Sequence, residues 1–186
     1  MRIIAGTLKG RRLKPPTWDG LRPTSDTLRE TLFNILAPRI QGARVLDGYA
    51  GTGAIGIEAI SRGAAHVTFV ERDRRAQALI VDNLVQCRIT IGYAIIRASV
   101  ARALETLRDE TVSARGEPFD VLLFDPPYDA EIDAVLAAAG HVMAAGGVLV
   151  LEHARKRRTP AAPGRLVRTR EVIGGDSALA FYACQP

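Results

Sequence analysis

The sequence predicts an α/β protein with a doubly wound, mostly parallel β-sheet and a small N-terminal β-hairpin extension. First, residues 45–60 have the pattern of a strand, a glycine turn and a helix. Second, apolar runs at 66–70, 119–124 and 148–152 alternate with segments of helical periodicity, and strands that alternate with helices form parallel sheets. Third, 186 residues with 47% hydrophobic side chains suffice for one domain with its own core.

The first 20 residues are expected to form a basic arm. Strand-like runs at 2–5 and 11–13 flank a turn that contains two glycines, which predicts a β-hairpin. A connector rich in proline and glycine follows, in which Trp18 is expected to pack the hairpin against the body rather than contact bases. We therefore divide the chain into an arm at 1–20 and a main domain at 21–186.

The excess of positive over negative charge is confined to the first quarter of the chain. Residues 1–44 hold nine Lys and Arg against three acids, whereas residues 45–186 hold 16 against 17. Clustered basic side chains are typical of proteins that bind nucleic-acid phosphates, although a merely solvated basic surface has the same composition. The candidate RNA-binding residues are Arg2, Lys9, Arg11, Arg12 and Lys14.

A helix is predicted after the segment at 22–26. Apolar residues recur at helical spacing between 28 and 36, a serine or threonine in the preceding segment offers an N-cap, and Pro38 is expected to end the helix. Arg22 and Thr24 are equally well explained as ordinary helix-entry residues.

The glycine turn is expected to lie under a bound nucleotide. Gly51 and Gly53 permit positive φ and a close approach of the backbone to a ligand. With Gly56, and with Glu71 about 20 residues beyond, they also match the dinucleotide fingerprint. Asp47 favours S-adenosylmethionine instead, because its carboxylate would repel a pyrophosphate but complements an ammonium and a sulfonium. Capping of the following helix is the alternative role for Asp47.

Polar side chains are expected at the carboxyl ends of the predicted strands. Glu71 follows the strand at 66–70, and its two oxygens suit the two hydroxyls of a ribose. Because parallel strands end at the same edge of a sheet, these side chains should line one ligand site. The residues are Asp47, Glu71, Ser99 and Asp125.

The segment Asp125-Pro126-Pro127-Tyr128 follows the buried strand at 119–124. Two prolines remove two N–H donors, so the segment presents acceptors to a ligand. An exocyclic amino group is a suitable donor, and the same acceptors would stabilise positive charge on a nitrogen that attacks a methyl group. Tyr128 offers a face for stacking a base. A simple proline turn after a strand is the alternative.

The remaining sequence completes the sheet. A strand is expected at 93–97, and 166–172 with 178–183 predict a closing antiparallel hairpin. The basic run at 155–158 is equally consistent with an RNA-facing loop and with a solvated one.

Several classes of protein are not supported. Cys87 and Cys184 have neither metal-ligand nor disulfide spacing, and three scattered histidines add no metal pattern. No run of about 18 apolar residues exists, and the N-terminus lacks the apolar core of a secretion signal. We expect a cytoplasmic protein without a metal.

The order and spacing of these segments resemble the RsmD-type bacterial methyltransferases, which modify the N2 amino group of a guanine in small-subunit ribosomal RNA. The resemblance covers nearly the whole chain. The segments that carry it are 2–6, 22–26, 33–36, 45–63, 125–128 and 175–182.

The resemblance implies a Rossmann-like, seven-stranded fold of the class I S-adenosylmethionine-dependent methyltransferases. It implies a 16S ribosomal RNA substrate, either naked or in a small-subunit assembly particle, and we expect a monomer. Asp125, Pro126, Pro127 and Tyr128 would be catalytic. The cofactor-binding residues would be Arg22, Thr24, Asp47, Tyr49, Gly51, Gly53, Glu71, Arg72 and Ser99. Ser99 stands where relatives often carry Asp or Asn, and its hydroxyl is able to accept the same hydrogen bond.

Three other functions compete with this one. An adenine-N6 methyltransferase acting on DNA or RNA would use the same acidic Pro-Pro segment, because that segment serves any exocyclic amine. An NAD-dependent dehydrogenase is disfavoured by Asp47 and by the lack of a hydride-site histidine or lysine constellation. A non-catalytic RNA chaperone would leave both segments unexplained.

Overall fold

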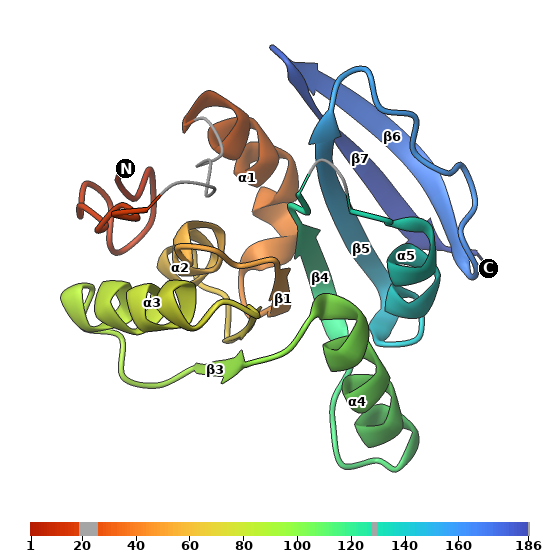
Figure 1. The fold of residues 1–186 in the computed structure, drawn as a ribbon, viewed down its shortest axis with the longest axis horizontal. Coiled ribbons are helices and arrows are strands. Elements are labelled where there is room, and N and C mark those ends of the chain that lie inside the picture. Colours follow the sequence, from red (N-terminus) through yellow and green to blue (C-terminus); the bar gives the residue numbers. More distant parts are fainter. Residues whose placement is uncertain (19–25, 128–129, 186) are drawn as a thin grey trace.

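The computed structural model describes residues 1–18, 26–127 and 130–185. Its seven-stranded sheet has the order β3-β2-β1-β4-β5-β7-β6 (Figure 1). The first five strands in this order are parallel, and β7 is antiparallel to both of its neighbours. The strands are β1 Arg44–Gly48, β2 His66–Val70, β3 Tyr93–Ile96, β4 Phe119–Phe124, β5 Met143–Ala154, β6 Leu166–Gly174 and β7 Ser177–Cys184.

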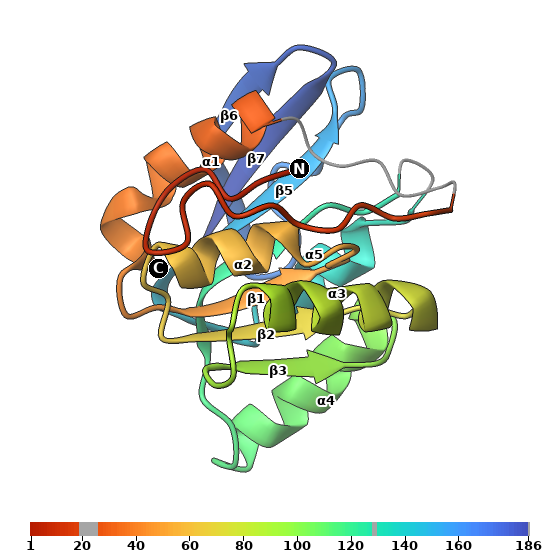
Figure 2. The same ribbon diagram turned by 90° about the vertical axis from the view of Figure 1, so that its left-hand side faces the viewer.

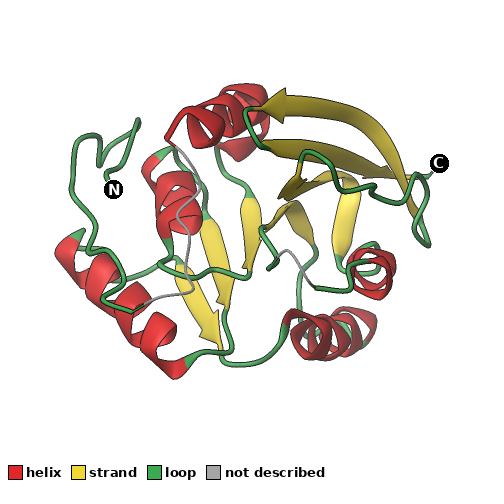
Figure 3. Ribbon diagram, turned by 45° about the horizontal axis from the view of Figure 1, so that its top comes forward, coloured by secondary structure: helices red, strands yellow, loops and turns green. Residues whose placement is uncertain are grey.

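Helices cover both faces of the sheet (Figure 3). One buried apolar layer includes residues of α1, α2 and α3, and a second includes residues of α4 and α5. Successive residues of the central strands pack into opposite layers: Val45 lies in the first and Leu46 in the second. The doubly wound α/β architecture is therefore confirmed. The helices are α1 Asp26–Ile40, α2 Ala54–Ser61, α3 Arg74–Gln86, α4 Val100–Val112 and α5 Asp133–Ala139.

The N-terminal segment, residues 1–18, packs along α2 and α3 (Figure 2). Ile3 and Leu13 are buried in the layer that contains α1–α3. The Oδ1 atom of Asn83, on α3, accepts a hydrogen bond of 2.7 Å from the backbone N–H of Lys14. The segment thus contributes to the core of the main domain.

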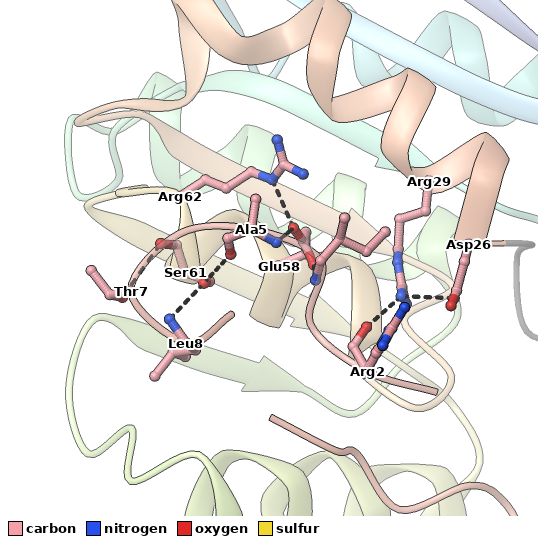
Figure 4. Close-up of polar contacts among 10 residues, drawn as sticks. Arg2, Ala5, Thr7, Leu8, Asp26, Arg29, Glu58, Ser61 and Arg62 are labelled. Atoms are coloured by element: carbon pink, nitrogen blue, oxygen red, sulfur yellow. Dashed lines mark hydrogen bonds and ion pairs between the residues drawn. The ribbon is translucent and has the colours of Figure 1, made fainter. Parts of the chain in front are cut away.

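Glu58 of α2 binds the same segment, as Figure 4 shows. Its side chain is fully buried and accepts hydrogen bonds from the backbone N–H groups of Ile4, at 2.8 Å, and Ala5, at 3.0 Å. The predicted hairpin is present but shorter than expected: its two arms pair in antiparallel fashion around Arg2 and Arg12, and the N–H of Ile3 donates to the Arg11 carbonyl at 2.9 Å. The pairing does not extend through residues 4 and 5, because the N–H groups of Ile4 and Ala5 bond the Glu58 carboxylate.

The predicted end of α1 is also wrong. The helix continues through Pro38 to Ile40. Pro38 lies in the last turn, where its missing N–H removes one backbone hydrogen bond without interrupting further turns. At the other end, the guanidinium of the buried Arg29 donates to the Arg2 carbonyl, at 2.6 Å, and to Asp26, at 3.0 Å (Figure 4).

Candidate active site

The strands that carry the predicted site residues end together at one edge of the sheet. Gly48, the last residue of β1, pairs with Val70 of β2 and with Phe124 of β4. Glu71 follows the end of β2 and Asp125 follows the end of β4. These two strands flank β1, so the two acids lie on either side of the glycine turn. As predicted, the fold brings to this carboxyl edge Asp47, Glu71, Ser99 and Asp125.

The turn between β1 and α2 runs through left-handed backbone conformations. Tyr49, Gly51 and Gly53 have φ values of 65°, 54° and 77°. Such values are favourable for glycine, whereas at Tyr49 they are unusual for a residue with a β-carbon. Gly53 is the N-cap of α2 and has no side chain with which to cap it.

Asp47 supplies the missing cap from the neighbouring strand. Its Oδ2 atom accepts a hydrogen bond of 2.9 Å from the N–H of Gly56, in the first turn of α2. Burial raises the pKa of Asp47 to about 7, against the lowering effect of the Gly56 hydrogen bond and with a further increase from the charge of Glu71. The capping role considered for Asp47 is thus present in the structure.

Gly56 is required by packing. A β-carbon at this position would lie 2.2 Å from Cε1 of Phe69, on β2, and 2.9 Å from Oδ2 of Asp47. Gly56 therefore lets α2 approach the sheet closely enough for the Asp47 hydrogen bond to form.

Glu71 fixes the loop on the other side of the turn. Oε2 accepts from the N–H of Gly51 at 2.9 Å, and Oε1 accepts from the N–H of Asp73 at 2.8 Å. A carboxylate oxygen accepts more than one hydrogen bond, so each oxygen keeps acceptor capacity for a ribose hydroxyl. Two carboxylates and a glycine backbone with no lysine or arginine inside the turn form a donor and acceptor set that fits S-adenosylmethionine better than a pyrophosphate.

Tyr49 and two arginines gather near this turn. The Tyr49 ring packs edge-on against Phe124, with centroids 6.1 Å apart and planes at 85°. Burial raises the pKa of Tyr49, and the positive charges of Arg72 and Arg157 act in the opposite direction. The contact with Phe124 links the glycine turn to the end of β4.

Ser99 begins α4 as its N-cap. The hydroxyl oxygen accepts a hydrogen bond from the N–H of Arg102 at 3.3 Å, and the residue is exposed at the carboxyl edge. A second lone pair is available on the same oxygen for a ligand.

The acidic Pro-Pro segment leaves the sheet directly after β4. Asp125 is half-buried, Pro126 is buried and Pro127 is exposed, and the Pro127 carbonyl accepts from the N–H of Ala130 at 3.0 Å. Arg22, Thr24 and Tyr128 lie outside the described residues.

Arg157, which the sequence analysis named only as part of the basic run at 155–158, also lies in this region. It donates to the carbonyl of Ala130, just beyond the acidic Pro-Pro segment, and so links the loop after β5 to the loop after β4. Four consecutive basic residues carry no periodic signal, so nothing in the sequence distinguished Arg157 from its neighbours.

The five candidate RNA-binding residues lie in the N-terminal segment. Arg11 is half-buried and the other four are exposed, with Lys14 paired to Asp82 at 2.9 Å. Arg11 and Arg12 contact Gln86, the last residue of α3. Because α3 runs back from the carboxyl edge, these two arginines lie toward the opposite edge of the sheet.

Within the described residues there is no group of three or more His, Cys, Asp or Glu side chains suited to a metal ion. No described helix combines the length and hydropathy needed to cross a membrane.

Comparison with known proteins gives concordant matches. The family model described as conserved hypothetical protein 95 matches residues 1–183. Ribosomal RNA small subunit methyltransferase D of Escherichia coli K12 is 35% identical over 98% of this chain and 89% of its own length. The solved structure of the Escherichia coli protein yhhF superposes with a TM-score of 0.82 at 32% identity, over 100% of this chain and 98% of that one. An Agrobacterium tumefaciens S-adenosylmethionine-dependent methyltransferase shares the fold, with a TM-score of 0.59 at 18% identity over 84% of this chain and 60% of that one.

Proposed function

Because the chain belongs to the conserved hypothetical protein 95 family, we infer that it transfers a methyl group from S-adenosylmethionine to small-subunit ribosomal RNA. One structural observation carries this inference. The acidic Pro-Pro segment and the glycine turn leave adjacent parallel strands, β4 and β1, at the same edge. A methyl donor over the turn and an amine held by the segment would then be neighbours.

S-adenosylmethionine supplies the electrophilic methyl group. Glu71 would accept hydrogen bonds from the ribose hydroxyls, and Asp47 would complement the ammonium group through its negative charge. The backbone of Gly51 and Gly53 would lie against the ligand. Tyr49, Arg72, Ser99, Arg22 and Thr24 complete the proposed cofactor-binding set.

The substrate atom we propose is the exocyclic N2 of a guanine. Asp125 and the Pro126 carbonyl would accept hydrogen bonds from its two N–H groups. Pro127 has no backbone N–H that could compete as a donor. Tyr128 would stack on the base. The nitrogen lone pair forms the new N–C bond, the C–S bond breaks with its electron pair left on sulfur, and the nitrogen then loses a proton.

Asp125 acts by position and charge in this scheme. Its task is to orient the amine and to stabilise the positive charge that develops on nitrogen. No covalent enzyme intermediate is required.

The proposed partner is 16S ribosomal RNA or a small-subunit assembly particle, bound by a monomer in the cytoplasm where ribosomes are made. The basic N-terminal residues support this proposal. They are Arg2, Lys9, Arg11, Arg12 and Lys14.

Methyl mapping tests the function. The protein is incubated with labelled S-adenosylmethionine and either ribosomal RNA or small subunits, and the labelled nucleotide is identified by mass spectrometry. We expect one N2-methylguanine in 16S RNA. Label on the N6 atom of an adenine would show that the enzyme is an adenine-N6 methyltransferase instead. No transfer to ribosomal RNA or to small subunits would contradict the proposed function.

A further inference from the structure

A solvent-open basic pocket lies where the N-terminal segment crosses the end of α3. It is lined by Arg11, Arg12, Gln86 and Arg88 and has a volume of about 390 Å³. Arg88 is distant in sequence from the basic N-terminal residues, so the pocket is assembled by the fold.

Gln86 holds the two sides of the pocket together. Its side-chain Nε2 donates to the Arg12 carbonyl at 2.5 Å, and its backbone carbonyl accepts from Nη1 of Arg11 at 3.2 Å. These two hydrogen bonds fix Arg11 and Arg12 beside the end of the helix, next to Arg88.

The pocket carries unbalanced positive charge. Within the described part of the chain, none of the three arginines forms an ion pair with a carboxylate. The acid of the last two turns of α3, Asp82, is paired with Lys14 at 2.9 Å. Three guanidinium groups without an acid supply the positive charge and the hydrogen-bond donors that a phosphate requires.

Arg88 occupies a backbone position that favours glycine. Its φ is 58°, its N–H bonds the Val85 carbonyl at 2.9 Å, and the N–H of Ile89 bonds the Leu84 carbonyl at 2.9 Å. This is a Schellman ending, in which the left-handed residue is usually glycine. Helix α4 ends in the same way, with Ala114 at φ 55° in the equivalent position. The arginine side chain at residue 88 therefore has no role in forming the helix end.

We propose that Arg11, Arg12 and Arg88 form a binding site for a backbone phosphate of the substrate RNA. The site lies about 20 Å from the carboxyl edge, the length of the 13-residue α3. It would contact a part of the RNA remote from the methylated base and fix the orientation of the RNA on the enzyme. The inference rests on the proposed function, since it takes the RNA substrate from there.

The test uses Arg88→Gly in the full-length protein. Glycine suits the left-handed conformation, so the Tm is expected to equal or exceed that of the wild type. Affinity for a 16S RNA fragment, measured by fluorescence anisotropy, is expected to fall about fivefold. The slope of log affinity against log salt concentration is expected to become shallower, by the amount that corresponds to the loss of about one phosphate contact.

Two control variants isolate the effect. Ala114→Gly makes the same backbone change at the end of α4 without changing charge, and Arg115→Ala removes one exposed charge beside that helix end. Both are expected to keep the wild-type RNA affinity within about twofold. An Arg88→Gly protein that is folded and keeps wild-type affinity and salt slope would overturn the pocket assignment, as would an equal loss in Arg115→Ala. Wild-type protein that methylates no ribosomal RNA would instead refute the proposed function.

Discussion

Buried carboxylates organise the candidate site residue by residue. Asp47 accepts a hydrogen bond from a backbone N–H of α2, and Glu71 accepts from N–H groups of the glycine turn and of the loop after β2. Hydrogen bonds from backbone amides to charged acceptors are stronger than neutral ones, so they hold the glycine turn in place before any ligand arrives. The sequence placed both acids at strand ends. It left open whether Asp47 caps α2 or faces a ligand, because both roles require an acid at the same position.

The pKa of Asp47 leads to a pH-dependent stability. Between its unfolded value of 3.8 and about 7, the folded protein retains a proton that the unfolded chain releases. The free energy of unfolding therefore falls as pH rises through this window. Asp47→Asn removes the titration, so its stability relative to wild type should increase from pH 4 to pH 8 by up to ~4 kcal/mol. Urea denaturation at several pH values measures this, and a constant difference between the two proteins would contradict the assignment.

Gly56→Ala should reverse the usual effect of alanine in a helix. Alanine normally stabilises a helix interior by about 1 kcal/mol relative to glycine. Here its β-carbon would lie 2.2 Å from the Phe69 ring. We expect a net loss of about 2 kcal/mol in the free energy of unfolding, the scale of overpacking. Phe69→Leu in the same chain should recover part of it, and strictly additive effects in the double-mutant cycle would argue against the clash.

At the scale of elements, the N-terminal segment departs most from the sequence-based prediction. Its strand-like runs and turn glycines predicted a hairpin, and a short one forms, in which the N–H of Ile3 donates to the Arg11 carbonyl. Other N–H groups of the segment bond Glu58 and Ser61 of α2, contacts that were not predicted. Contacts 53 or more residues apart leave no local pattern, so the sequence could not show them. The α/β core was predictable because strands 66–70 and 119–124 are short apolar runs between helical periods.

Glu58→Gln should weaken the attachment of this segment. The carboxylate is fully buried, and besides the two backbone donors it pairs with Arg62 at 2.7 Å. Removing one charge of a buried pair destabilises by about 3 kcal/mol or more. Urea denaturation is the measurement. Glu105→Gln, in the exposed pair with Arg102, is the matched control and should change stability by less than about 1 kcal/mol. An equal loss of unfolding free energy in Glu58→Gln and Glu105→Gln would show that the burial of Glu58 does not add to stability.

At the scale of the whole molecule, the carboxyl edge and the basic pocket lie at opposite ends of α3. One end of the molecule would hold the reacting groups, and the other would hold the RNA backbone. The charge asymmetry of the sequence predicted basic residues near the N-terminus. The contribution of Arg88 to the basic pocket and the contact of Arg157 with Ala130 depend instead on how distant loops pack together. Arg88 belongs to no recognisable pattern, and Arg157 belongs only to the basic run at 155–158, which does not show what it contacts.

The central claim is that methyl transfer takes place at the acidic Pro-Pro segment after β4. The most direct test is the single-turnover rate of transfer to small-subunit RNA at saturating S-adenosylmethionine, with Asp125→Ala compared against Asp109→Ala, an exposed acid on α4. We expect Asp125→Ala to lower the rate by ~10²-fold or more with cofactor affinity nearly unchanged, because one preorganised electrostatic partner of the amine is lost. Asp109→Ala should transfer at the wild-type rate. Near-normal transfer by Asp125→Ala would contradict the claim.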